Sequence, residues 1–162
     1  MRKKIISVVC FLLAVFVSHG IAADSAPFFF LQLSDPQFGF MDNNKSISAE
    51  TEAMNKAVTA INQLKPPFVV ITGDFVNNSK SKEQIAAYKS MIAQIDSSVK
   101  VYMIPGNHDI GKVSRSSIDN YKKNYGETHF SFRYGDCAFI GIDSNIIKEE
   151  DKEKIGRASC RE

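Results

Sequence analysis

Met103-Ile104-Pro105-Gly106-Asn107-His108-Asp109 is the segment around which the other motifs of this 162-residue chain are arranged. The apolar run that leads into it, from Val99 to Ile104, is typical of a buried strand, and a Pro-Gly break ends it. Three polar residues that can bind ions or transfer protons follow at once. Because open α/β sheets bind ligands at the carboxyl ends of their strands, this segment predicts one wall of a functional site.

Two earlier segments have the same design. Leu31-Gln32-Leu33-Ser34 leads into Asp35-Pro36-Gln37, and Val69-Val70-Ile71-Thr72 leads into Gly73-Asp74. In both, a short uncharged run ends at residues whose side chains carry oxygen donors. We therefore expect three strands that deliver metal ligands to one edge of a sheet.

The segments between these strands have helical periodicity. Apolar residues recur at intervals of three and four in 54–64 and in 85–95, and Pro66-Pro67 ends the first helix. Ser81 with Gln84, and Ser116 with Asp119, have the spacing of capping boxes for the second and third helices. The expected strands are 27–34, 68–72, 99–104, 129–134 and 137–142, the first two buried on both faces and the last two joined by a turn at Gly135-Asp136. This alternation predicts a layered α/β sheet in one domain.

The first 23 residues have the pattern of a cleavable secretory signal. Three basic residues precede an apolar run that is too short for a membrane-spanning helix, and small residues end it before Asp24. We therefore expect an exported protein, periplasmic or secreted, with no stable membrane anchor. Without that segment, 17 of the 20 Lys and Arg residues remain against 18 Asp and Glu, which indicates no general attraction to nucleic acid.

Residues 155–162 (IGRASCRE) have neither periodicity nor strand character. They match the translation of a common short sequencing adapter, so we expect a non-native tail there and a folded part in 24–154. Of the two cysteines beyond the signal, Cys160 then belongs to the tail, and Cys137 is expected to be a small buried core residue.

Asp35, Asp74, Asn107 and His108 are a set of side chains suited to phosphoryl chemistry. Singly, each residue fits a turn or a cap; as an ordered set at strand ends they favour a metal site. Two ions about 3.5–4 Å apart lower the pKa of a shared water and clamp the attacking and leaving oxygens of a phosphoryl group. His108 would then be a general acid for the leaving oxygen, or a cation that stabilises transition-state charge. Asp109 is assigned to a cap.

At these residues the chain resembles the calcineurin-like metallophosphoesterase superfamily. The motifs of that superfamily are Asp-x-His, Gly-Asp-x-x-(Asp/Asn) and Gly-Asn-His-(Asp/Glu). Here Asp35-Pro36-Gln37, Gly73-Asp74-Phe75-Val76-Asn77 and Gly106-Asn107-His108-Asp109 stand in their places. The resemblance covers about residues 28–144, and it implies a layered α-β-β-α sandwich of which only the N-terminal part is present. The phrases SDPQFGF and PGNHDIG further resemble the subfamily of calcineurin-like phosphoesterase domain-containing protein 1, a serine/threonine phosphatase group.

The resemblance implies a role for each motif residue. Asp35 and Gln37 would ligate the first metal ion, Asp74 both ions and Asn107 the second ion, with His108 as the catalytic histidine. Gln37 departs from the usual histidine at its position. A glutamine oxygen is harder than imidazole, which shifts the expected preference of the two divalent ions from zinc toward manganese, magnesium or iron.

Asn77 and His129 complete the candidate residues. Asn77 falls where related phosphatases often have an aspartate that orients the catalytic histidine. Its amide can accept a hydrogen bond but adds no negative charge. His129, at the start of an expected strand, is assigned a structural role rather than metal ligation.

The implied reaction is hydrolysis of a phosphate ester, on a small molecule or a phosphoprotein, by a hydroxide that two metal ions activate. The alternatives are a phosphodiesterase acting on nucleotides or lipid head groups, and a non-catalytic relative that binds metal or phosphate. Two further histidine motifs of the superfamily have no counterpart in this sequence. We therefore expect the full-length parent to carry the activity and the fragment alone to be inactive.

Overall fold

The computed structural model describes residues 26–147. Its strands are β1 (Leu31–Ser34), β2 (Phe68–Thr72), β3 (Lys100–Ile104), β4 (Phe130–Tyr134) and β5 (Cys137–Gly141). Its helices are α1 (Ser48–Leu64), α2 (Lys82–Ile92), α3 (Asn107–Ile110), α4 (Arg115–Tyr125) and α5 (Ser144–Ile147). The predicted order of elements is confirmed, and the four-residue helices α3 and α5 are additions to it. The predicted signal (1–23) and tail (155–162) lie outside the described residues, within which no helix is long and apolar enough to cross a bilayer.

Strands β1, β2 and β3 form a parallel sheet in that order. The predicted burial of β2 on both faces is confirmed, because Val69 and Ile71 pack in the helix-side core while Phe68 contacts aromatic rings on the other side. The same prediction for the first strand is wrong. β1 begins only at Leu31 and alternates between half-buried and exposed residues, since among the described strands it pairs with β2 alone.

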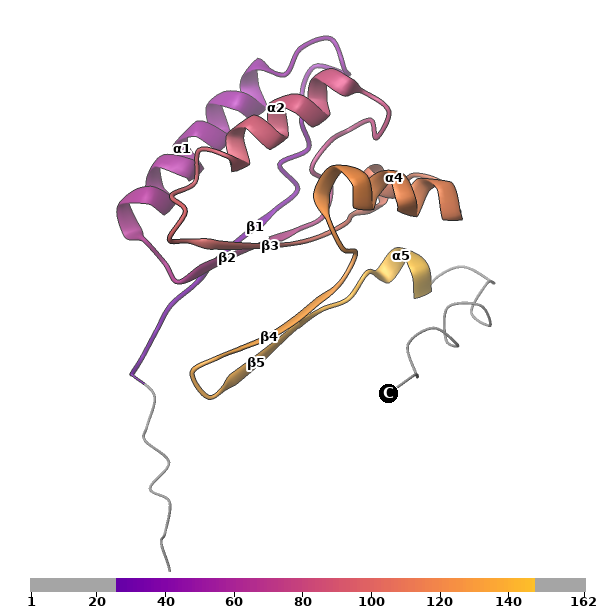
Figure 1. The fold of residues 1–162 in the computed structure, drawn as a ribbon. Helices are drawn as coiled ribbons and strands as arrows, with labels where there is room; N and C mark the ends of the chain where they lie inside the picture. Colours follow the sequence, from indigo (N-terminus) through magenta and orange to yellow (C-terminus); the bar gives the residue numbers. More distant parts are fainter. Residues whose placement is uncertain (1–25, 148–162) are drawn as a thin grey trace, which may run out of the picture.

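Helices α1 and α2 lie together over one face of this sheet (Figure 1). Met54, Val58 and Ile61 of α1 are buried there as predicted, whereas Leu64 at the end of the stripe is 55% exposed. The buried stripes of the two helices and the inward residues of the strands make the main core. The sheet and its helices thus form the first two layers.

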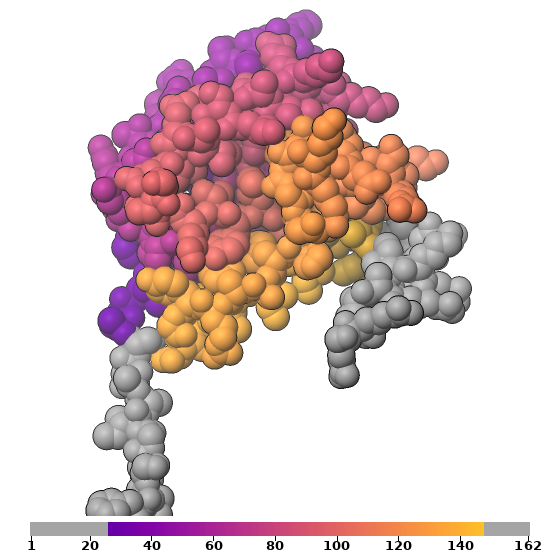
Figure 2. Space-filling model, viewed as in Figure 1, coloured from indigo at the N-terminus to yellow at the C-terminus, as the bar shows by residue number. Residues whose placement is uncertain are grey.

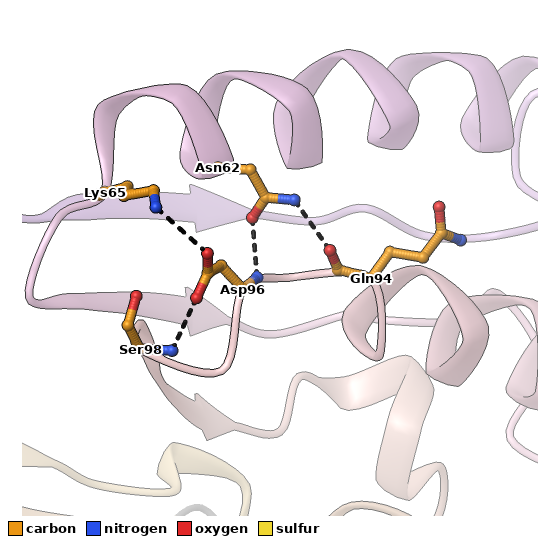
Figure 3. A network of polar contacts seen from close by, with 5 residues as sticks. All are labelled: Asn62, Lys65, Gln94, Asp96 and Ser98. Atoms are coloured by element: carbon orange, nitrogen blue, oxygen red, sulfur yellow. Dashed lines mark hydrogen bonds and ion pairs between the residues drawn. The ribbon is translucent and has the colours of Figure 1, made fainter.

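A polar network fixes the end of α1 against the connection between α2 and β3 (Figure 3). The Asn62 side chain donates to the Gln94 carbonyl and accepts from the Asp96 amide, both at 2.8 Å, and Lys65 lies 3.5 Å from the Asp96 carboxylate. Asp96 also accepts from the backbone N–H of Ser98 at 2.9 Å. One amide side chain therefore satisfies two backbone groups of a loop, which fixes where β3 begins.

The antiparallel hairpin β4–β5 covers the other face of the sheet (Figure 1). Figure 2 shows the same division on the surface, with α1 and α2 on one side of the molecule and the orange-to-yellow hairpin on the opposite side. Aromatic rings join the two sheets: Phe132 stacks on Tyr102 with centroids 3.8 Å apart, and Phe139 lies 4.9 Å from Phe68. The described residues therefore form α, β and β layers, and a fourth layer of the expected sandwich is not found among them.

Two local predictions are corrected by the structure. Cys137 is exposed rather than buried, because it follows the hairpin turn at the free end of the ribbon. The N-cap of α4 is Ser114, whose hydroxyl accepts from the Ser117 amide at 3.1 Å, so the predicted pairing of Ser116 with Asp119 is wrong. Serine is a preferred N-cap residue, so both Ser114 and Ser116 are suitable N-caps for α4. Hydrophobic periodicity does not distinguish between helix starts that differ by two residues.

Candidate functional site

The carboxyl ends of the three parallel strands meet as predicted. Beyond the sheet, the Gly73 amide donates to the Ile104 carbonyl at 2.9 Å, and the Asp35 amide donates to the Gly73 carbonyl at 3.2 Å. The Gln37 amide then donates to the Asp74 carbonyl at 2.8 Å. The three segments that carry the motifs therefore lie against one another through main-chain hydrogen bonds.

Three of the four predicted metal ligands have left-handed backbone conformations. The φ angles are 52° at Asp35, 34° at Gln37 and 39° at Asp74. Such angles are uncommon for residues other than glycine, and each costs free energy that the surrounding contacts must offset. This concentration of strain at the strand ends is typical of a functional site.

Asp74 is the most enclosed of the four, with 8% of its surface exposed. Its Oδ1 accepts a hydrogen bond from the His108 amide at 2.8 Å, which joins the segment after β2 to the start of α3. The approach is close enough that Gly106 admits no side chain, since a Cβ there would collide with the carboxylate and the backbone nitrogen of Asp74. Gly73 is less confined in space, because its own Cβ would lie 3.1 Å from the Gly106 Cα, but its φ of 77° is one that favours glycine.

The half-buried ring of His108 is oriented by a main-chain group. Its Nδ1 lies 2.9 Å from the backbone carbonyl oxygen of Asn77. A carbonyl only accepts, so this hydrogen bond requires a proton on Nδ1 and leaves Nε2 as the nitrogen available for exchange with a substrate.

The Asn77 side chain does not orient His108, although sequence reasoning gave its amide that role. Its Oδ1 accepts from Gln37 Nε2 at 3.3 Å, and its Nδ2 donates to Asn44 Oδ1 at 2.9 Å. The side chain thus links the first motif to the loop before α1. Only coordinates distinguish the two roles, because an asparagine can use either its main chain or its side chain as an acceptor.

Asp109 holds the site together, and sequence reasoning assigned it only a cap. It does cap α3, accepting from the Gly106 amide at 2.9 Å, but its other oxygen also accepts from the amides of Phe75 and Val76, at 2.8 and 3.2 Å. Burial raises the pKa of its carboxyl to about 7, while the three amide donors act in the opposite direction. In the sequence, the only indication of such a role was that Asp109 occupies the Asp/Glu position of the third motif.

Asn44 and Gln84 are two further residues that sequence reasoning missed. Asn44 Oδ1 accepts from the side chains of both Asn77 and Gln84, each at 2.9 Å. Gln84 accepts from the Asn78 amide at 2.8 Å instead of reaching back to Ser81, so only half of the predicted capping box forms. No local pattern indicates these contacts, which join residues as much as 40 positions apart.

A cavity of about 530 Å³ opens at this edge of the sheet. It is lined by Asn44, Asn77, Asn78, Ser79, Asn107, His108 and Gly111. Asn107 lines the cavity and is exposed. Asp74 is not a lining residue, but its carboxylate is hydrogen-bonded to the amide of His108, which is one. The Asp35 side chain borders a different cavity of about 220 Å³, on the α1 side, and accepts a hydrogen bond from the Ser34 hydroxyl.

The donors at these positions fit hard divalent ions. Asp35 and Asp74 offer carboxylates, and Asp74 Oδ2 has no hydrogen-bond donor among the described residues. Gln37 donates from its Nε2 to Asn77, and its side-chain oxygen has no hydrogen-bond donor within residues 26–147; Asn107 is exposed. Oxygen ligands of this kind suit manganese, magnesium or ferrous iron.

The described residues do not by themselves form a closed metal-binding cage. Within 26–147, no three His, Cys, Asp or Glu side chains gather where they could hold a metal ion. His129, the other histidine in that range, is exposed beside β4 and does not line the cavity.

Sequence comparisons place the chain among phosphoesterases. The family described as calcineurin-like phosphoesterase matches residues 30–155. Serine/threonine-protein phosphatase CPPED1 of Bos taurus is 32% identical over 142 residues, covering 78% of this chain and 45% of that protein. A probable glycerophosphodiester phosphodiesterase, GpdQ of Arcobacter nitrofigilis, is 31% identical over 99 residues, covering 59% of this chain and 35% of that protein.

A solved structure has the same fold. The crystal structure of a dimetal phosphatase from Danio rerio has a TM-score of 0.56 at 19% identity, over 81% of this chain and 50% of that one. The chain spans about half the length of the curated relatives it matches. The family match extends over most of the chain and includes all three strand-end motifs. The chain therefore belongs to the calcineurin-like phosphoesterase family.

Proposed function

We propose that the complete protein containing this chain is a metal-dependent phosphatase that hydrolyses phosphate monoesters. The observation that supports this most directly is the hydrogen bond from the His108 amide to Asp74, which sets a predicted metal ligand and the predicted catalytic histidine side by side. Relatives from cattle and human that carry the name serine/threonine-protein phosphatase support the same class of reaction.

Asp35, Gln37, Asp74 and Asn107 would hold two divalent ions. When bound, the ions supply Lewis acidity that lowers the pKa of a water and offsets the charge of the phosphoryl group. Gln37 fixes the segment after β1 through its bond to Asn77 at 3.3 Å, and Asp74 fixes the segment after β3 through its bond to His108. These contacts limit the movement of the ligands when substrate binds.

His108 would donate a proton to the leaving oxygen. The Asn77 carbonyl holds the Nδ1–H, so the exchanged proton resides on Nε2. In its cationic form the ring donates from Nε2 to the ester oxygen, and the carbonyl dipole at Nδ1 stabilises the positive charge. A serine or threonine alkoxide leaves poorly without a proton, and general acid catalysis of this kind contributes about 10²- to 10⁴-fold.

The test uses the complete protein with p-nitrophenyl phosphate as substrate. The His108→Ala variant is expected to lose at least a hundredfold in kcat, about the size of a general-acid contribution. Asp74→Asn removes a proposed metal ligand and should also lower kcat strongly. In both variants far-UV circular dichroism should remain that of the wild type. His129→Ala is the matched control, because it removes an exposed histidine outside the cavity and should retain full turnover. Wild-type turnover in His108→Ala would exclude the proposed mechanism.

A second candidate is a phosphodiesterase, which the similarity to GpdQ over 99 residues favours. The same site could stabilise an alkoxide leaving from a diester. A higher kcat/KM for bis-p-nitrophenyl phosphate than for p-nitrophenyl phosphate would support this function in place of the first.

A further inference from the structure

A second cavity, of about 710 Å³, adjoins the one that contains His108. The two share Ser79 and Gly111 as lining residues, so they are continuous at the surface. The second cavity lies between the start of α2 and one side of α4, and Figure 1 shows that the two helices begin on the same side of the molecule. We call this second cavity the lysine groove.

Four lysines line the lysine groove: Lys80, Lys82, Lys112 and Lys123. Among the described residues that line it, none is an aspartate or a glutamate. The ion pairs within 26–147 are made by other lysines, such as Lys122, which lies next in sequence to Lys123 and pairs with Glu127 at 2.6 Å. The four charges of the groove are therefore uncompensated among the described residues and create a positive field beside the site.

The start of one helix adds to this field. α2 begins at Lys82 and has 11 residues, so its positive dipole end lies at the groove, whereas α4 lines the groove along its length, from Ser114 to Asn124. Serine and asparagine side chains provide further polar groups along the wall, among them Ser116 and Asn120. The lysine groove therefore suits an extended anion rather than a neutral or cationic ligand.

The size and the composition of the groove distinguish between polyanions. The 530 Å³ cavity at His108 is already within the range of roughly 300–1,000 Å³ that holds a small molecule, so the additional 710 Å³ points to a longer substrate. Among the described lining residues there is no aromatic side chain and no arginine on which a base could stack. An acidic peptide needs only the lysine charges, whereas a single-stranded nucleic acid would lack its stacking partners.

We propose that the lysine groove binds acidic residues that flank a phosphoserine or phosphothreonine held at His108. The protein would then prefer phosphoproteins whose phosphorylated residue lies in an acidic segment. This inference rests on the proposed phosphatase function. It deepens that function, because it assigns the substrate class and gives Lys80, Lys82, Lys112 and Lys123 the role of specificity residues.

The test compares three phosphothreonine peptides as substrates of the complete protein. They have the same length and carry three aspartates, three asparagines or three lysines on each side of the phosphothreonine. The acidic peptide should have a kcat/KM about tenfold above the neutral one at low salt, and the advantage should shrink toward 1 M salt as the charges are screened. The basic peptide should be the poorest substrate.

A matched pair of double variants locates the effect. Lys82→Gln with Lys123→Gln removes one groove lysine from α2 and one from α4, and should lower kcat/KM for the acidic peptide about fivefold while leaving p-nitrophenyl phosphate turnover unchanged. Lys89→Gln with Lys122→Gln removes the same charge from the same helices outside the groove and should change neither value. Equal kcat/KM for the three peptides, or an equal loss in the control variant, would overturn the proposal.

A binding measurement separates this inference from the proposed function. Fluorescence anisotropy of a labelled acidic peptide that contains a non-hydrolysable phosphonate reports on the groove without turnover, and Lys82→Gln with Lys123→Gln should raise its Kd about fivefold. Failure to hydrolyse p-nitrophenyl phosphate together with normal peptide binding would reject only the phosphatase function. If an oligonucleotide displaces the labelled peptide at a lower concentration than the unlabelled peptide does, the ligand of the groove is a nucleic acid and the proposal of an acidic peptide is wrong.

Discussion

The Asp74 carboxylate, after β2, lies 2.8 Å from the backbone nitrogen of His108, after β3, and accepts its hydrogen bond. This contact joins two motifs that are 34 residues apart in the sequence. It exists only because the intervening Gly106 has no side chain, since a Cβ there would occupy the position of the Asp74 carboxylate.

The Gly106→Ala variant tests this close approach. The added methyl would displace Asp74 and with it the start of α3, so we expect a fall in kcat of about a hundredfold and a loss of about 1–3 kcal/mol of stability. Activity and urea unfolding of the complete protein measure the two effects. Gly126→Ala is the control, because a Cβ at that left-handed glycine has nothing within 4 Å and should leave kcat near the wild-type value. Normal activity in Gly106→Ala would contradict this prediction, because it would show that the segments that carry Asp74 and His108 can move apart without loss of function.

The Asp109→Asn variant tests the residue that joins the second and third motifs. Both carboxylate oxygens accept from backbone amides, and an asparagine offers only one acceptor and turns its NH₂ group toward a donor. We expect a loss of about 1–3 kcal/mol in the free energy of unfolding, measured by urea denaturation. Asp119→Asn, on the exposed side of α4, should change it by less than about 0.5 kcal/mol. An unchanged midpoint in Asp109→Asn would contradict the bridging role.

The Asn77→Ala variant tests how His108 is oriented. Because the Nδ1 partner is the main-chain carbonyl of Asn77, the variant keeps that hydrogen bond and loses only the links to Gln37 and Asn44. We expect kcat to fall by less than about tenfold, far less than the loss expected for His108→Ala. The pH profile of kcat/KM should keep its midpoint. A loss as large as that of His108→Ala would mean that the side chain orients the ring during turnover.

The Gln37→His variant tests the metal preference. Imidazole is softer than a glutamine oxygen, so the variant should retain a larger share of zinc than the wild type when both are exposed to equal zinc and manganese. Elemental analysis of the complete protein measures this share. Histidine is among the side chains that tolerate left-handed φ, so the substitution suits the φ of 34° at this position. Gln32→His, on an exposed position of β1, is the matched control, and an equal gain of zinc there would remove the argument.

Local patterns predicted the elements well and their surroundings poorly. The helical stripe of α1 and the uncharged run of β2 were recognised because periodicity and β-branched content are properties of a few adjacent residues. The exposure of β1 and of Cys137 was not predicted, because the exposure of a strand residue depends on which other segment of the chain covers it. Likewise, the start of α4 depended on which of two nearby serines could reach a free amide.

By itself, the sequence determined the order of strands and helices and the three strand ends at which Asp35, Asp74 and Asn107 occur, because each is encoded within a few residues. Only the tertiary structure decided how these ends meet: that Asp109 accepts from two loops, that the Asn77 carbonyl holds His108, and that four lysines line one groove. The physical reason is that, apart from the local cap that Asp109 forms with Gly106, these contacts join segments about 30 or more positions apart. Their geometry follows from packing and from the need to pair buried polar groups, which no local spacing records.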